Sequence, residues 1–96
     1  MIFTITYDIS DSKLDHSGFF NAIKSLGPWM RYIETSWLLS TSRFDNAEGI
    51  LDFIRPHMDE AEDYILVAEL TTNYNGWLPD DAWKWIRDQR TGVPTS

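Results

Sequence analysis

Apolar and polar residues alternate along the first nine positions of the chain. Phe3, Ile5 and Tyr7 fall on one side of an extended backbone, while Asp8 falls on the other. This period of two predicts a strand from Ile2 to Ile9. Its apolar side is expected to meet helices, and its other side to be open or to pair with a partner.

Two segments carry apolar residues at helical spacing. The first predicted helix begins among residues 15–17 and ends at Gly27-Pro28, because Gly and Pro terminate helices. The second begins at a capping box made by Asp45 and Glu48 and has its last turn near Pro56. The apolar stripes are Phe19, Phe20, Ile23 and Leu26 in the first helix, and Ile50, Leu51, Phe53 and Ile54 in the second.

Three further strands are predicted, over Trp29–Glu34, Trp37–Thr41 and Tyr64–Leu70. The first two would form a tight hairpin, but the connection lacks an Asn-Gly or Asp-Gly pair. Residues 34–36 are therefore either a turn or the middle of one long bent strand. In the second case the order of strands in the sheet would change.

The order β-α-β-β-α-β predicts an α+β fold of the ferredoxin-like type, with a four-stranded antiparallel sheet. Both helices are expected on one face, and strands one and four at central or near-central places. Pro79-Asp80-Asp81 opens a short additional C-terminal helix. We expect one domain over residues 1–90 and a flexible tail over residues 91–96.

Composition agrees with one domain, since 96 residues with 43% hydrophobic content can fill a single core. No apolar run is long enough for a membrane helix, and there is no cysteine for disulfides. Residues 1–4 have neither a basic nor an apolar signal region, so we expect a cytoplasmic protein. Fifteen acidic and eight scattered basic residues give a net charge of −7. This balance disfavours tight nucleic-acid binding by a single chain.

Asp8, at the end of the first strand, is the main candidate for chemistry. A carboxylate there is a ligand for Mg²⁺ or Mn²⁺, and two copies brought together in a dimer would make a better site than one. A metal held in this way activates water for attack on a phosphodiester. The alternative is that Asp8 and Asp11 accept hydrogen bonds from backbone amides in the following turn. His16 is a weaker candidate for a general base.

Residues 1–11, which end in Tyr-Asp-Ile-Ser-Asp, resemble the N-terminus of the CRISPR-associated Cas-two family. Ser36-Trp37-Leu38 and Gly76-Trp77-Leu78-Pro79, with Ala82-Trp83, are more similar to its SinR-like branch of small proteins, which has no settled function. The resemblance implies a homodimer with a metal-binding aspartate that matches Asp8. It also implies either nuclease activity or a scaffold role. The family usually has a basic cluster after this aspartate, where residues 12–16 here hold one lysine.

Tryptophans and acidic residues suggest contact surfaces. Five Trp residues are too many for a small core under two helices, so Trp37, Trp77, Trp83 and Trp85 are predicted to include contacts with a second subunit. The C-terminal helix would then join the dimer contact or cover an edge strand. Four acids precede the last strand and form either an acidic patch or a solvated loop. They are Asp59, Glu60, Glu62 and Asp63.

Two functions follow from these observations. The first is a small acidic homodimeric interaction module, without catalysis, that binds a basic protein partner. The alternative is a Mg²⁺- or Mn²⁺-dependent endonuclease acting on RNA or DNA with Asp8 from both subunits. The missing basic cluster favours the module, whereas Asp8 favours the nuclease. Fold alone does not decide between them.

Overall fold

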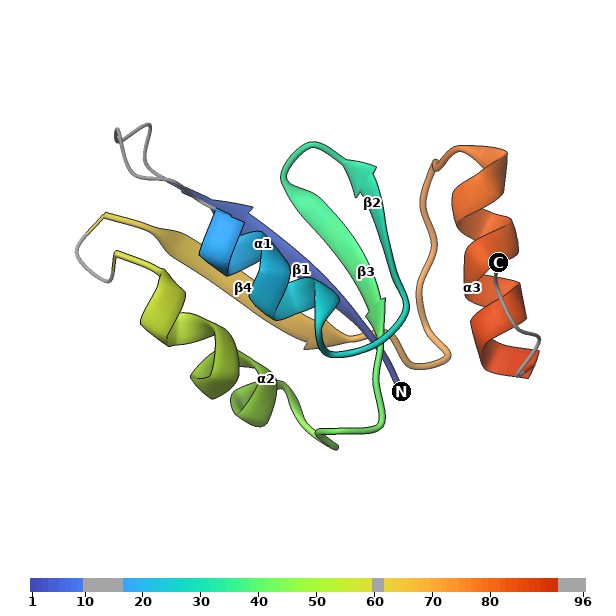
Figure 1. The fold of residues 1–96 in the computed structure, drawn as a ribbon. Helices are drawn as coiled ribbons and strands as arrows, with labels where there is room; N and C mark the ends of the chain where they lie inside the picture. Colours follow the sequence, from blue (N-terminus) through green and yellow to red (C-terminus); the bar gives the residue numbers. More distant parts are fainter. Residues whose placement is uncertain (10–16, 60–61, 92–96) are drawn as a thin grey trace.

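The structure, a computed structural model, describes residues 1–9, 17–59 and 62–91 (Figure 1). Its elements are β1 (Ile2–Asp8), α1 (Ser17–Lys24), β2 (Trp29–Ile33), β3 (Ser36–Ser40), α2 (Ala47–Ile54), the 3-10 turn η1 (Arg55–His57), β4 (Tyr64–Glu69) and α3 (Asp80–Thr91). The helix α3 includes Thr91, the first residue of the predicted tail, and the remainder of that tail lies outside the described residues.

The four strands form one sheet in the order β2-β3-β1-β4, with every neighbouring pair antiparallel. This order and the β-α-β-β-α-β succession confirm the ferredoxin-like α+β fold. The expected central place of strand four is wrong, because β4 pairs with β1 and has no described strand on its other side. The central strands are β1 and β3, and β4 is an edge strand.

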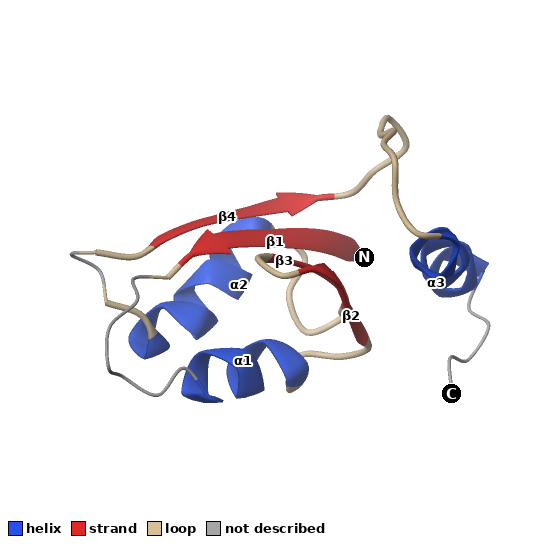
Figure 2. Ribbon diagram, turned by 90° about the horizontal axis from the view of Figure 1, so that it is seen from above, coloured by secondary structure: helices blue, strands red, loops and turns tan. Residues whose placement is uncertain are grey.

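One face of the sheet packs against α1 and α2, which lie together on that side (Figure 2). The β1 side chains Phe3, Ile5 and Tyr7 are buried there, as their alternation predicted. Trp37 of β3 joins them, and its Nε1 donates a hydrogen bond to the Tyr7 hydroxyl at 3.0 Å. That hydroxyl in turn donates to the carbonyl of Glu34 at 3.0 Å, so the polar atoms of both rings are satisfied.

The opposite face is partly covered by α3, which stands apart from α1 and α2 (Figure 1). A second apolar cluster joins Ile2 and Leu38 of the sheet to Trp85 and Ile86 of α3. The Arg90 guanidinium fastens this helix to the preceding segment, because it donates to the carbonyls of Leu70 and Thr71 and to the Tyr74 hydroxyl. The helix therefore covers part of this face and also contacts the edge strand β2, as expected for one of its two predicted roles.

Two local predictions are resolved by the structure. Residues 34–35 form a tight turn between β2 and β3, so the hairpin is confirmed and the single bent strand is excluded. The capping box of Asp45 and Glu48 is wrong, because the N-cap of α2 is Asn46. Its side-chain oxygen accepts from the backbone N–H of Gly49 at 2.8 Å. An Asn cap uses the same chemistry one residue later.

Gly27 allows the turn between α1 and β2. Its φ is +151°, which favours glycine, and an added Cβ would lie 2.2 Å from the backbone carbonyl oxygen of Ser40. The neighbouring backbone is held in place, because the Ser40 N–H donates to the carbonyl of Pro28 at 2.8 Å. The close approach therefore fixes how α1 leads into the hairpin.

We expect Gly27→Ala to lower the free energy of unfolding by about 2 kcal/mol or more, because backbone atoms cannot yield to the added methyl group. Urea denaturation followed by circular dichroism measures this loss. Gly76→Ala is the matched control, since an added Cβ there meets nothing within 4 Å. Equal effects of the two substitutions would contradict the described packing of Gly27.

Candidate functional site

Asp8 lies at the C-terminal end of β1 with its side chain exposed. It projects from the face opposite Phe3, Ile5 and Tyr7, so its predicted placement away from α1 and α2 is confirmed. On the neighbouring edge strand its register partner is Tyr64. The carboxylate is therefore accessible to a molecule that approaches the open face of the sheet.

Two cross-strand pairs define what we call the open-face patch: Thr6 with Leu66, and Asp8 with Tyr64. Residues directly opposite in an antiparallel pair point to the same face, so these four side chains are neighbours. Tyr64 is 72% exposed and Leu66 is 64% exposed. The patch carries a shallow hollow whose lining includes all four residues. An aromatic and an aliphatic side chain thus lie uncovered beside one carboxylate.

The open-face patch is what remains of the face after α3 has covered the opposite end of β1. Ile2, at the start of the strand, is buried under α3, while Thr6 and Asp8 are exposed. At the boundary, the Thr6 hydroxyl is hydrogen-bonded to the buried Ser36 hydroxyl at 3.0 Å. One face of the sheet is therefore divided into a covered half and an open half.

No lysine or arginine is among the described residues that line the hollow of this patch. Several cations instead lie against aromatic rings elsewhere, which holds them on other surfaces. Lys24 lies 4.9 Å from the Trp29 ring centroid, and Arg31 lies 5.1 Å from that of Phe20. A phosphate at the open-face patch would face Asp8 without a nearby cation from the described part of the chain.

Metal binding by one chain is not supported by the described residues. Among them, no group of three or more His, Cys, Asp or Glu side chains is placed to hold a metal ion. Among the described residues that line the hollow of the open-face patch, Asp8 is the one carboxylate. The described part of one chain would therefore supply a single carboxylate to a Mg²⁺ or Mn²⁺ ion there. Asp11 and His16 lie outside the described residues.

The four tryptophans predicted to form an interface are placed in three different environments. Trp37 is buried in the main core, and Trp85 of α3 is buried between that helix and the sheet, so both side chains pack inside the fold instead of at an interface. Trp83 is half-buried against the second cluster. Trp77, in the segment between β4 and α3, is fully exposed and stays a candidate for contact with another molecule.

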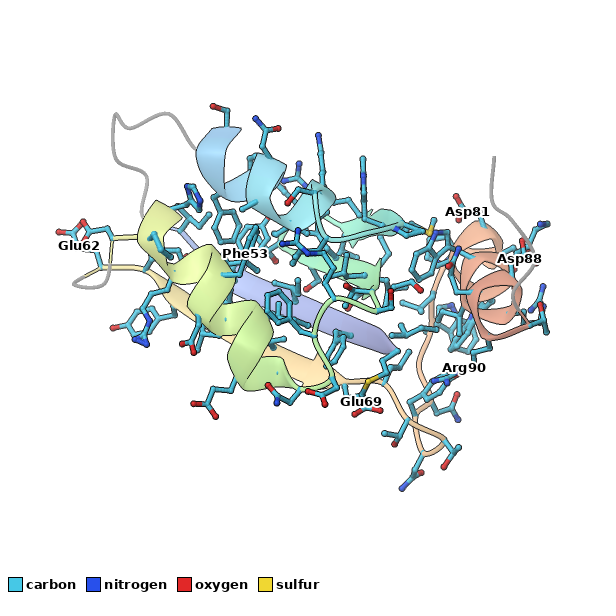
Figure 3. All side chains as sticks on the ribbon, turned by 60° about the horizontal axis from the view of Figure 1, so that its bottom comes forward. Phe53, Glu62, Glu69, Asp81, Asp88 and Arg90 are labelled. Atoms are coloured by element: carbon cyan, nitrogen blue, oxygen red, sulfur yellow. The ribbon has the colours of Figure 1, made fainter. Side chains whose placement is uncertain are left out.

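Two of the acidic residues before β4, Asp59 and Asp63, are hydrogen-bonded to each other. The Asp63 carboxylate accepts from the Asp59 backbone N–H at 2.9 Å, and the Asp63 N–H donates to the Asp59 carbonyl at 2.8 Å. Glu62 is exposed at this end of the molecule, whereas Asp81 and Asp88 lie on α3 at the other end (Figure 3). The described acids are thus spread over the surface. Glu60 lies outside the described residues.

Tyr64 and Leu66 were not identified as site residues from the sequence. Tyr64–Leu70 is a mostly apolar run, which predicts a strand buried on both faces. The misplacement of strand four at the centre of the sheet concealed their exposure. Tyr64 and Leu66 lie directly opposite Asp8 and Thr6 in the paired strands. An edge position for this strand would therefore have placed both side chains on the open face.

Comparison with known proteins identifies the fold and no family. No protein-family model and no curated protein matches the chain. A solved structure, a hypothetical protein TT1823 from Thermus thermophilus, superposes with a TM-score of 0.57 at 18% sequence identity. The match covers 81% of this chain and 93% of that chain. At this level of identity the likeness shows the fold alone.

None of the described helices is both long enough and apolar enough to cross a bilayer.

Proposed function

We propose that this protein is a non-catalytic interaction module that forms a homodimer through the open-face patch. The observation that carries the proposal is the exposure of Tyr64 and Leu66 side by side with Thr6 on an uncovered sheet face. Burying apolar and aromatic side chains against their own copies removes them from water in a self-complementary contact. The occupant of the patch is therefore a second copy of this chain.

The charge distribution supports a protein partner over a nucleic acid. Two chains at −7 each give a dimer with a net charge of −14. Arg31, a described cation of the sheet, lies over Phe20 and Trp37 on the other face. A dimer with this charge attracts basic proteins and repels phosphate backbones. The resemblance to the Cas-two family, whose members are homodimers, agrees with the proposed assembly.

We expect Leu66→Lys to weaken self-association about tenfold or more, because an unpaired charge in a buried apolar contact costs more than the roughly 1.4 kcal/mol that a tenfold change represents. Sedimentation equilibrium over a range of concentrations gives the dissociation constant. Asn73→Lys is the control: it adds the same charge at an exposed position beyond the C-terminal end of β4, and Asn73 does not line the hollow of the patch. A native protein that remains monomeric at tens of micromolar, or equal effects of both substitutions, would refute the proposed contact.

A metal-dependent endonuclease is the second candidate, and the exposure of Asp8 on the same patch favours it. In a dimer, the Asp8 carboxylates of two copies would hold Mg²⁺ or Mn²⁺, which supplies the Lewis acidity for phosphodiester hydrolysis. The described residues of one chain include no group of three or more His, Cys, Asp or Glu side chains placed to hold a metal ion. This candidate therefore depends on both the dimer and the close approach of the two aspartates.

If the protein is a non-catalytic module, labelled RNA and DNA incubated with it and Mg²⁺ or Mn²⁺ should remain intact, and Asp8→Ala should change nothing. Gel electrophoresis of the products measures cleavage. The control Asp81→Ala removes an exposed acid from α3, distant from β1's C-terminal end. Metal-dependent cleavage that Asp8→Ala abolishes and Asp81→Ala preserves would establish the nuclease instead.

A further inference from the structure

A pocket separate from the open-face patch lies where α3 meets the sheet. Its volume is about 150 Å³, and it opens to solvent. It is bounded by the sheet, by α3 and by the segment that joins β4 to α3. The residues on which the following argument rests are Thr4, Tyr32 and Leu38 of the sheet, Tyr74 and Leu78 of the segment, and Trp83 of α3.

The size and the walls of the pocket fit one aromatic ring. Apolar cavities of about 150 Å³ in other proteins accept benzene. Here Tyr32, Tyr74 and Trp83 supply aromatic walls, against which a ring can stack or pack edge to face. Leu38 and Leu78 supply aliphatic surface.

A pair of hydroxyl groups gives the sheet side of the pocket a polar point, while Asn75 lies in the lining on the side of the connecting segment. The Thr4 Oγ1 and the Tyr32 hydroxyl, contributed by β1 and β2, lie 3.1 Å apart and share a hydrogen bond. Whichever oxygen accepts that bond keeps its own proton for another acceptor, and both oxygens keep lone pairs. The pair can therefore donate to, or accept from, one hydroxyl group of a ligand.

The charge of the lining determines the charge of the ligand. None of the described residues that line the pocket is ionised at neutral pH. Arg90 is nearby, but its guanidinium is engaged by the carbonyls of Leu70 and Thr71 and lies 5.2 Å from the Tyr74 ring centroid. Placing a carboxylate in an apolar pocket without a paired cation is costly, so the pocket favours a neutral molecule.

We propose that this pocket binds a small neutral phenol, a single aromatic ring with one hydroxyl group. The ring lies between α3 and the sheet, and its hydroxyl reaches the Thr4–Tyr32 pair. The site does not depend on the dimer of the proposed function, because neither Asp8 nor Leu66 lines it. It adds a ligand-responsive contact between α3 and the sheet.

Titration of the full 96-residue protein with p-cresol, followed by amide nitrogen–proton NMR, tests the proposal. We expect saturable shifts at pocket residues with a dissociation constant on the order of a millimolar, as is usual for a ligand of this size. The anion p-toluate, which has a similar ring and a carboxylate, should bind at least tenfold more weakly. Toluene, which lacks the hydroxyl, should also bind more weakly than p-cresol.

Two kinds of variant locate the site. Tyr32→Phe preserves the ring and removes one hydroxyl, so it should reduce the preference for p-cresol over toluene while toluene still binds. Leu78→Trp should fill the pocket and abolish binding. Its control, Asn73→Trp, adds the same side chain to an exposed position of the same segment that does not line the pocket.

The proposal would be overturned by linear, non-saturating shifts, by shifts centred on Tyr64 and Leu66, or by equal affinity for p-cresol and p-toluate. Unchanged binding in Leu78→Trp would also overturn it, provided that the spectrum of this variant shows a folded protein. Should that variant fail to fold, the Tyr32→Phe variant decides the question. An unaltered preference for p-cresol over toluene in Tyr32→Phe would show that the ligand hydroxyl does not contact the Thr4–Tyr32 pair.

Discussion

The pairing of β1 with a strand on each side is the constraint on which the rest of the structure depends. This strand pairs with β3 on one side and β4 on the other, so its backbone is fixed by both neighbours. Because side chains alternate, Phe3 and Ile5 must enter the main core while Ile2 and Thr4 face the other way. A shift of one residue in register would expose the core residues and bury Asp8.

That alternation also explains why the sequence predicted the fold well and the site only in part. Period-two and helical patterns are local, so β1 and both covering helices followed from them, whereas the same patterns left the choice between a hairpin and one bent strand open. The edge position of β4 depends on pairing between distant segments, which no local pattern contains. The number of tryptophans was also explained by packing between distant segments. The helix α3 creates a second apolar cluster with the sheet, and Trp85 is buried there by residues of the same chain. The number of aromatic residues predicted a second surface but could not say that the chain itself supplies it.

The helix α3 divides the open face into two surfaces with different chemistry. Where it packs, Thr4 and Tyr32 lie in an uncharged pocket with aromatic walls. Beyond its reach, Leu66 and Asp8 are exposed to solvent. The Arg90 contacts to the carbonyls after β4 hold this division in place, since they tie the helix to the strand that carries the open-face patch. A ligand under α3 and a partner on the patch would thus act on the two ends of the same strands.

The position of a two-fold axis on the open-face patch separates the two candidate functions. Thr6 and Leu66 form one cross-strand pair, and Asp8 and Tyr64 form the next pair toward the end of β1. An axis near Leu66 would place the apolar residues at the centre and the two aspartates at the rim, where water screens their repulsion. An axis near Asp8 would bring two carboxylates together in a partly desolvated contact, which is unfavourable unless a cation lies between them. The module therefore requires the first arrangement and the nuclease the second, so the same four residues support either function according to where the copies meet.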